Sequence, residues 1–224
     1  MPTPTATSCH AVPTAAPAKG SPKLDLVGSP NGGKTSVFNQ LTGLHAKTGN
    51  YPGVTVSRST GVCRIGKDEY GIEDLPGAYS LTPISPDEAV VAEALDGSLE
   101  NVQAPDAVLV VTDATALRRS LLLLAETLER KLPTAVIVTM TDELRRRGGS
   151  LDITALSQAL GVPVVSVIAN RGIGIGELRH LISEWQTWSR PPVSPPTAAD
   201  ELAGWVDLSL IHISEPTRPE RLSY

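Results

Sequence analysis

The chain has 224 residues, a formal net charge of -5 and 41% hydrophobic residues, which is enough apolar content for one domain core. Because it carries no overall basic charge to attract nucleic acid, we expect no nucleic acid among its partners. Cys9 and Cys63 are its two cysteines and form no CxxC pair, which argues against a disulfide framework and a zinc site. No apolar run reaches the roughly 18 residues of a membrane span and no signal peptide pattern is present, so we expect a soluble, cytoplasmic piece.

Residues 1–22 are rich in proline, threonine and alanine and contain almost no large apolar side chains. Such a segment cannot bury enough surface to offset the entropy cost of ordering, so we expect a disordered N-terminal arm. Cys9 and His10 are adjacent in this arm and could touch a metal ion. An inert pair in a flexible tail is the more frequent case, and we assign them no role.

Residues 23–188 alternate short β-type runs with longer helical ones, which predicts βα units in an α/β fold of three layers. The fold would have a mostly parallel six-stranded sheet flanked by helices. We expect strands at 23–28, 54–65, 69–75, 106–114, 134–140 and 162–168. We expect helices near 34–42, 86–96, 115–131, 150–160 and 174–188. Apolar and polar residues alternate in the second strand, which predicts a place at the sheet edge.

The stretch GSPNGGKT at residues 28–35 matches the G-x-x-x-x-G-K-[ST] loop, between a predicted strand and a predicted helix, and indicates a P-loop NTPase fold. The backbone N–H groups of such a loop bind the α and β phosphates, and the plainer alternative is a tightly packed glycine-rich turn. Lys34 would reach the β and γ phosphates and Thr35 would ligate Mg²⁺. The expected nucleotide contacts here are Gly28, Asn31, Gly32, Gly33, Lys34, Thr35 and Ser36.

Two further stretches suggest a GTPase. DLPG at 74–77 ends a predicted strand and matches the D-x-x-G element, in which Asp74 would hold Mg²⁺ through water and the Gly77 amide would sense the γ-phosphate. Between this element and the loop lies TGNYPGVTVS at 48–57, where Thr55 is the candidate switch threonine that closes over Mg²⁺ and the γ-phosphate, with Gly53 and Val54 beside it. Alone, each signal is weak, since D-x-P-G is also a turn and Thr55 could be an ordinary strand residue.

Three segments, GSPNGGKTSVFNQLTG, TGNYPGVTVSRSTG and DLPGAYSL, resemble the G domain of the bacterial ferrous-iron transport protein B (FeoB) family. The similarity extends over residues 23–188. The resemblance implies a GTP- and GDP-binding, GTP-hydrolysing regulatory domain with Mg²⁺, in which Lys34, Thr55 and Gly77 would act in catalysis. It also implies a cytoplasmic domain of a bacterial inner-membrane protein, whose partner would be the membrane transport domain of the same full-length protein.

The guanine-recognition element departs from the family pattern. Where N-x-x-D is expected, this chain has TMTD at 139–142. Asp142 can still accept hydrogen bonds from the guanine N1 and exocyclic amine. Thr139 is shorter than Asn and is expected not to tie the phosphate loop to the base loop in the same way, which would lower the affinity. Ala169 is the candidate for an amide near the guanine O6, although its segment could be a plain loop.

The hydrolysis machinery also lacks one expected group. Ala78 and Tyr79 follow D-x-x-G where many GTPases carry a glutamine that orients the attacking water, so we expect slow intrinsic turnover. The resemblance implies a compensating potassium ion held by Asn31, although Asn is also a common turn residue. Two alternatives stay open, namely a stand-alone translation or ribosome-assembly GTPase and a nucleotide-binding switch with negligible hydrolysis.

The C-terminal residues look unlike the domain before them. Residues 189–200 are a proline-rich linker, and a helical domain is expected to begin before residue 207. The stretch LSLIHISEPTRP at 208–219 resembles the translation of a sequencing adapter. We therefore expect residues 208–224 to be a non-native tail, with a natural variable tail as the alternative.

Overall fold

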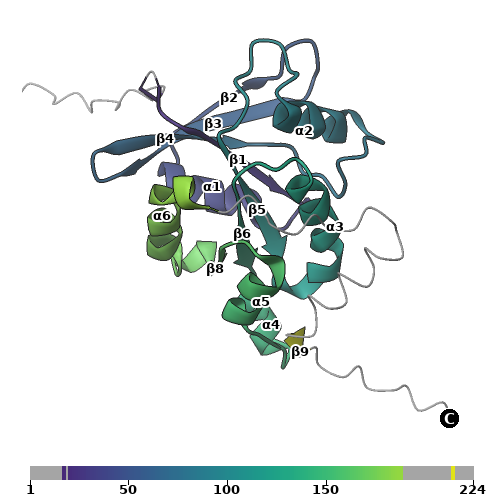
Figure 1. Cartoon of the computed structure of the whole chain (residues 1–224), viewed down its shortest axis with the longest axis vertical. Coiled ribbons are helices and arrows are strands. Elements are labelled where there is room, and N and C mark those ends of the chain that lie inside the picture. The colour runs from purple at the N-terminus through teal and green to yellow at the C-terminus, as the bar shows by residue number, and fades with distance from the viewer. Residues whose placement is uncertain (1–16, 19, 189–212, 215–224) are drawn as a thin grey trace, which may run out of the picture.

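A computed structural model describes residues 17, 18, 20–188, 213 and 214 (Figure 1). The expected linker and most of the expected N-terminal arm and non-native tail therefore lie outside the described residues. At the end of the arm, the Pro22 carbonyl accepts a hydrogen bond from the Gly71 amide at 2.9 Å. The chain thus enters the main sheet immediately after this contact.

Seven strands form the main sheet, in the order β2-β3-β4-β1-β5-β6-β8 (Figure 1). The pairs that join β4, β1, β5, β6 and β8 are parallel, whereas β2 and β4 each run antiparallel to β3. The strands are β1 Lys23–Gly28, β2 Ala46–Asn50, β3 Ser57–Ile65, β4 Asp68–Asp74, β5 Ala107–Asp113, β6 Thr134–Thr139 and β8 Val164–Ser166. A separate pair joins β7 Ser150–Leu151 to β9 Ile213–Ser214.

Helices cover both faces of this sheet. The helices are α1 Lys34–Thr42, α2 Pro86–Asp96, α3 Leu117–Leu128, α4 Thr141–Arg146, α5 Ile153–Leu160 and α6 Ile175–Ser183. Three short 3-10 turns are η1 Ala114–Ala116, η2 Ala169–Arg171 and η3 Trp185–Thr187. One core cluster joins α1 and α6 to the sheet, and the other joins α2, α3 and α5 to the opposite face. The result is the expected three-layer α/β fold.

Local sequence explains several element boundaries. Helix α2 begins after Ser85, whose side chain accepts a hydrogen bond from the Glu88 amide at 3.3 Å, with Pro86 in the first turn. It ends at Gly97, which has a φ of 68° and so takes the left-handed conformation that closes many helices. Strand β6 is buried along its whole length because helices cover both sides of it.

The second expected strand does not lie at the edge of the sheet. The part of the expected segment 54–65 that forms a strand is β3, which pairs with β4 on one side and with β2 on the other. Strand β2 was not predicted, because Ala46–Asn50 is polar and largely exposed. Hydrogen bonding to β3 makes this polar segment a strand. The main sheet therefore has seven strands where six were expected.

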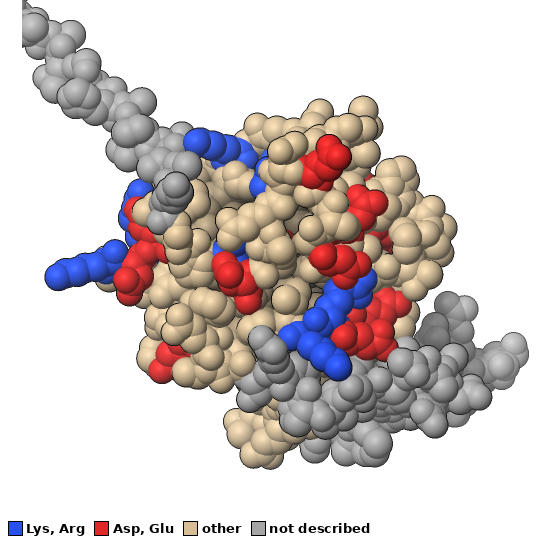
Figure 2. All heavy atoms as spheres, turned by 45° about the horizontal axis from the view of Figure 1, so that its top comes forward, with Lys and Arg blue, Asp and Glu red and all other residues tan. Residues whose placement is uncertain are grey.

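The surface carries charges of both signs. On the face drawn in Figure 2, acidic and basic side chains are interspersed over the described residues. Interspersed charges give this face no broad field of one sign. Specific pairs, in place of a general charge attraction, are therefore the features to examine on this side of the molecule.

Candidate nucleotide-binding site

The carboxyl ends of the parallel strands bring the expected site residues to one edge of the sheet. Strand β1 ends in the loop 28–33 and β4 ends at Asp74, beside it in the sheet. Strand β6 ends at Thr139, two strands away. This edge is where open α/β sheets bind their ligands.

The N-terminus of α1 has no side-chain cap. Gly33 precedes the helix with a φ of 82°, a conformation that glycine adopts without strain. By contrast, Asp152 caps α5 by accepting a hydrogen bond from the Ala155 amide at 3.0 Å. The first turn of α1 contains no acidic residue. Its uncapped amides and the helix dipole therefore suit an anion.

Lys34, Thr35 and Asp74 form a connected polar group next to this helix start. The Lys34 ammonium donates to the Asp74 carboxylate, with Nζ 2.5 Å from Oδ1, and also to the Leu75 carbonyl. The Thr35 hydroxyl donates to the other carboxylate oxygen at 3.0 Å. Lys34 and Asp74 are both buried. Lys34 and Asp74, which belong to two separate motifs 40 residues apart in the sequence, thus contact each other in the fold.

Gly77 lies against the phosphate loop. A Cβ atom built on Gly77 would come within 3.0 Å of both the backbone N and the Cα of Pro30. The Ala78 amide donates to the Gly28 carbonyl at 3.1 Å. The backbone of the D-x-x-G element therefore packs directly on the loop, and a side chain at position 77 would separate them.

Thr55 is not brought to this group. It lies in an exposed turn, residues 52–55, between the buried residues Tyr51 and Val56. The Tyr51 amide donates to the Val56 carbonyl at 3.0 Å, which closes the turn. Among the described residues, no hydrogen bond joins Thr55 to Lys34, Thr35 or Asp74. Gly53 has a φ of 78° and Val54 is 40% exposed, so the expected switch residues share one exposed turn.

The structure corrects the expectation for Thr139. Its hydroxyl lies 2.7 Å from the Gly32 carbonyl oxygen and 3.0 Å from the Thr112 carbonyl oxygen, and it can donate a hydrogen bond to either one. Thr139 therefore does tie the end of β6 to the phosphate loop. The shorter side chain suffices because the loop approaches closely, with a Cβ on Gly33 falling 3.4 Å from the Thr139 Cγ2.

We expect Thr139→Val to lower the free energy of unfolding by about 1 to 2 kcal/mol, since valine keeps the shape but removes a buried donor. The same change should weaken GDP binding several-fold, because the phosphate loop loses its tie to β6. Urea unfolding and calorimetry with GDP measure the two effects. The matched control is Thr127→Val, which removes a buried hydroxyl that bonds the Leu123 carbonyl within α3. Equal GDP affinity in the Thr139 variant would contradict the positioning role.

Asp142 and Ala169 lie at the same sheet edge as Thr139. Asp142 is in the first turn of α4, a helix that the sequence analysis did not predict, and its carboxylate pairs with Arg146 at 3.3 Å. Ala169 begins η2 directly after β8. The hydroxyls of Thr141 and Ser166 lie 3.0 Å apart and join these two loops. Sequence analysis missed that link, which has no motif of its own.

Comparisons with known proteins agree with this geometry. The family profile described as "Ferrous iron transport protein B" matches residues 23–182. The chain belongs to the FeoB family. It is 42% identical over 165 residues to the Fe(2+) transporter FeoB of Leptospira biflexa serovar Patoc, covering 74% of this chain and 23% of that protein. It is 38% identical over 159 residues to the Salmonella typhimurium FeoB, covering 71% and 20%. The chain thus spans less than a quarter of each.

Solved FeoB structures share the fold. The cytosolic domain of T. maritima FeoB in apo form gives a TM-score of 0.73 at 34% identity, covering 80% of this chain and 69% of that one. The isolated T. maritima FeoB G domain gives 0.66 at 37% identity and is covered over 99% of its length. A mutant of S. thermophilus NFeoB bound to GDP gives 0.68 at 36% identity, covering 80% and 66%. The P-loop fold predicted from the sequence is confirmed.

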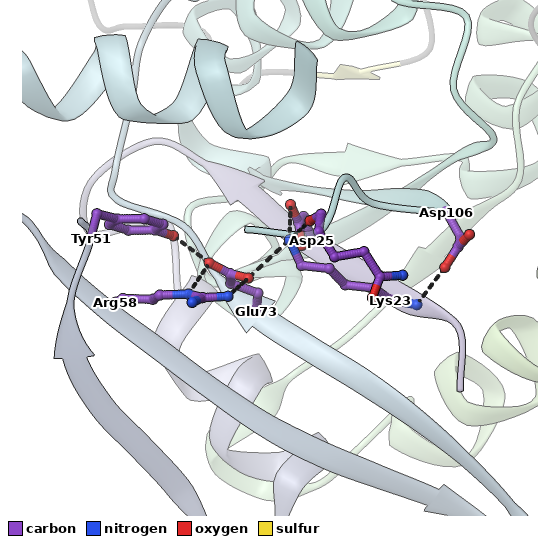
Figure 3. Close-up of polar contacts among 7 residues, drawn as sticks. Lys23, Asp25, Tyr51, Arg58, Glu73 and Asp106 are labelled. Atoms are coloured by element: carbon purple, nitrogen blue, oxygen red, sulfur yellow. Dashed lines mark hydrogen bonds and ion pairs between the residues drawn. The ribbon is translucent and has the colours of Figure 1, made fainter. Parts of the chain in front are cut away.

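This FeoB chain also contains a buried polar network that no motif predicted (Figure 3). It runs across β3, β4 and β1 and connects Tyr51, Arg58, Glu73, Lys23, Asp25 and Asp106. Burial raises the pKa of Asp25 to about 7, although Lys23 beside it lowers that pKa in part. Asp25 lies only three residues before the phosphate loop begins.

Within the described residues of this FeoB chain, no helix is both long enough and apolar enough to span a membrane. The same residues contain no group of three or more His, Cys, Asp or Glu side chains placed to hold a metal ion. Cys9 and His10, which the sequence analysis considered and left without a role, lie outside the described residues.

Proposed function

We propose that this domain binds GTP and GDP, hydrolyses GTP and regulates a ferrous iron transporter. The observation that carries the proposal is the contact of Lys34 and Thr35 with Asp74 beside the uncapped start of α1. Family membership and the GDP-bound solved neighbours support it. The catalytic residues that we propose are Lys34, Thr55 and Gly77.

The phosphates would bind at the loop 28–33 and the first turn of α1, with contacts that include Ser36. Lys34 pairs with Asp74 in this structure. When a nucleotide binds, the Lys34 ammonium would exchange the Asp74 carboxylate for phosphate oxygens, which are also negatively charged. The exchange keeps a buried cation paired throughout, which limits its cost. Gly77, packed against Pro30, would present its amide toward the γ-phosphate.

The donor set fits Mg²⁺. Thr35 and Asp74 offer oxygen atoms only 3.0 Å apart, and hydroxyl and carboxylate oxygens are ligands that Mg²⁺ prefers. We propose Thr35 as a direct ligand, Asp74 as a ligand through water, and Thr55 as a ligand after the turn 52–55 closes. When bound, the ion would neutralise charge on the β and γ phosphates.

The guanine base would lie between the ends of β6 and β8. Asp142 would accept from the base N1 and exocyclic amine after releasing Arg146, and the Ala169 amide would lie near O6. Thr139 and Thr141 would hold the two base loops through their contacts with Gly32 and Ser166. These contacts favour guanine, because adenine cannot supply the donors that Asp142 needs.

Neither residue after D-x-x-G can orient the attacking water. Ala78 is buried, and the Tyr79 ring carries the Arg119 guanidinium at 5.6 Å from its centroid. We propose slow intrinsic hydrolysis, assisted by a potassium ion that the Asn31 side chain holds near the phosphates. Asn31 is exposed in the loop, with a φ of 65°, and its amide oxygen is a suitable cation ligand.

We expect phosphate release from GTP to be faster in KCl than in NaCl, and Asn31→Ala to remove the difference. The reason is electrostatic, since charge grows on the β–γ bridging oxygen and a cation there would stabilise it. Phosphate release in matched KCl and NaCl buffers measures this, with Asn39→Ala in α1 as a matched control. Full potassium stimulation in the Asn31 variant would refute this role. Absence of any GTP-dependent release would leave a binding switch without hydrolysis.

The partner that we propose is the membrane transport domain of the same full-length protein. The curated relatives are iron transporters several times longer than the segment that they share with this chain. This domain would then lie at the cytoplasmic face of a bacterial inner membrane. Co-purification of the domain with the remainder of its transporter, but not with ribosomes, tests this placement against the translation GTPase alternative.

A further inference from the structure

The exposed turn 52–55 is fixed at one end by a buried tyrosine. Tyr51 is 1% exposed, and its hydroxyl donates to the Glu73 carboxylate at 2.7 Å. Burial and the negative charge of Glu73 raise the pKa of this hydroxyl, so it stays protonated and remains a donor. On the far side of the turn, Val56 is buried and its carbonyl accepts from the Tyr51 amide.

Glu73 is held firmly in place. Arg58 donates to both of its oxygens, at 2.8 and 3.0 Å, and the Lys23 ammonium lies 2.9 Å from Oε2 (Figure 3). Burial acts to raise the pKa of Glu73, but the hydrogen bonds from Arg58 and Tyr51 and the charge of Lys23 outweigh it and hold the pKa below its usual value. The acceptor of the Tyr51 hydroxyl is thus an ionised carboxylate that Arg58 and Lys23 also contact.

Glu73 is also the immediate neighbour of Asp74 on β4. Successive side chains of a strand point to opposite faces. Glu73 therefore joins the polar network on the α2 face while Asp74, at the strand end, holds Lys34 and Thr35. A single peptide unit consequently links Glu73, which binds Tyr51, to Asp74, which binds Lys34 and Thr35.

We propose that Tyr51 is a positioning residue, whose hydrogen bond to Glu73 fixes the turn 52–55 relative to Asp74 and so sets how effectively Thr55 reaches the bound nucleotide. The inference rests on the proposed GTPase function and adds a regulatory element to it. A hydrogen bond to a charged acceptor is strong and directional. Without it, the turn is still held at this end by apolar packing, by the Arg58 guanidinium 5.7 Å from the centre of the Tyr51 ring, and by the backbone hydrogen bonds that join Tyr51 to Val54 and Val56.

We expect Tyr51→Phe to lower kcat for GTP hydrolysis about tenfold and to leave the GDP dissociation constant within about twofold of the unmutated value. Phenylalanine keeps the ring in the core and removes the hydroxyl alone. Amide hydrogen exchange at positions 51 and 54, whose N–H groups donate to the Val56 and Tyr51 carbonyls, should accelerate in the same variant without nucleotide, because the turn opens more often. A purely structural loss would instead lower stability and weaken GDP binding together with the rate.

The matched control is Tyr70→Phe. Tyr70 is a second buried tyrosine, on the α1 face of β4, and its hydroxyl makes no hydrogen bond to the described residues. Its variant should keep both the rate and the exchange of the turn. Equal kcat, or equal exchange of the amides at positions 51 and 54, in Tyr51→Phe and the unmutated protein would overturn the positioning role. If the unmutated protein binds no GDP, the proposed function is wrong. Comparing hydrogen exchange between Tyr51→Phe and the unmutated protein would still test whether the Tyr51 hydroxyl holds the turn.

Discussion

Replacing Lys34 with alanine is expected to abolish nucleotide binding, with a loss of at least about 100-fold in GDP affinity. We propose Lys34 as the cation that the phosphate loop supplies to the β and γ phosphates. Its removal also leaves the buried Asp74 carboxylate without the partner that lies 2.5 Å away, and this negative charge would then face the phosphates directly. Calorimetric titration with GDP measures the effect.

The control for this change is Lys67→Ala, which removes an exposed lysine from the turn between β3 and β4. It should bind GDP with the affinity of the unmutated protein. Circular dichroism establishes that each variant is folded, since a buried unpaired Asp74 costs stability. GDP affinity that survives in a folded Lys34→Ala protein would remove the phosphate-loop assignment.

The second large effect is expected at the base. We expect Asp142→Asn to reduce the preference for guanine over adenine nucleotides by about 1 to 3 kcal/mol. The asparagine amide keeps one acceptor oxygen but replaces the other with an NH₂ donor, so one of the two guanine donors, N1 or the exocyclic amine, would lose its acceptor. Competition binding of GTP and ATP to both proteins gives the preference directly.

The neighbouring acid provides a matched control for this prediction. Glu143→Gln makes the same acid-to-amide change one residue later, on a side chain that pairs with Arg146 and Arg147. It should leave the guanine preference intact. If the unmutated protein binds ATP and GTP equally, the assignment of guanine specificity is wrong. If only the Glu143 variant loses the preference for guanine, Glu143 and not Asp142 is the carboxylate that recognises the base.

Strong local signals made much of the fold predictable. The expected bounds of β1, α1 and α2 equal the observed ones, because a glycine-rich loop, a capping serine and closing glycines mark their ends. Strand β2 and helix α4 were missed for the opposite reason. The first is a polar segment ordered by pairing with β3, and the second is a single short helix of six residues.

The candidate site divides in the same way. The two motifs that contain Lys34 and Asp74 are recognisable in the sequence, whereas the contact between these two side chains was not itself predicted and arises because adjacent parallel strands carry the motifs. The contact of Tyr51 with Glu73 depends on the registers of two antiparallel pairings, β2 with β3 and β3 with β4, which no motif records. The tie from Thr139 to Gly32 depends on a close approach of two backbones, and side-chain length alone therefore gave the wrong expectation. The roles of the site residues remain predictions for the variants above to test.

The contact between Gly77 and Pro30 has a mechanical consequence. Most neighbouring segments in a protein can absorb a small displacement by rotating a side chain that lies between them. Here glycine has no side chain to rotate, and proline has a backbone angle fixed by its ring. A shift of about a few tenths of an ångström in the segment of Gly77 must therefore move the backbone of the phosphate loop at Pro30. Small displacements of one segment are thus transmitted to the other almost completely.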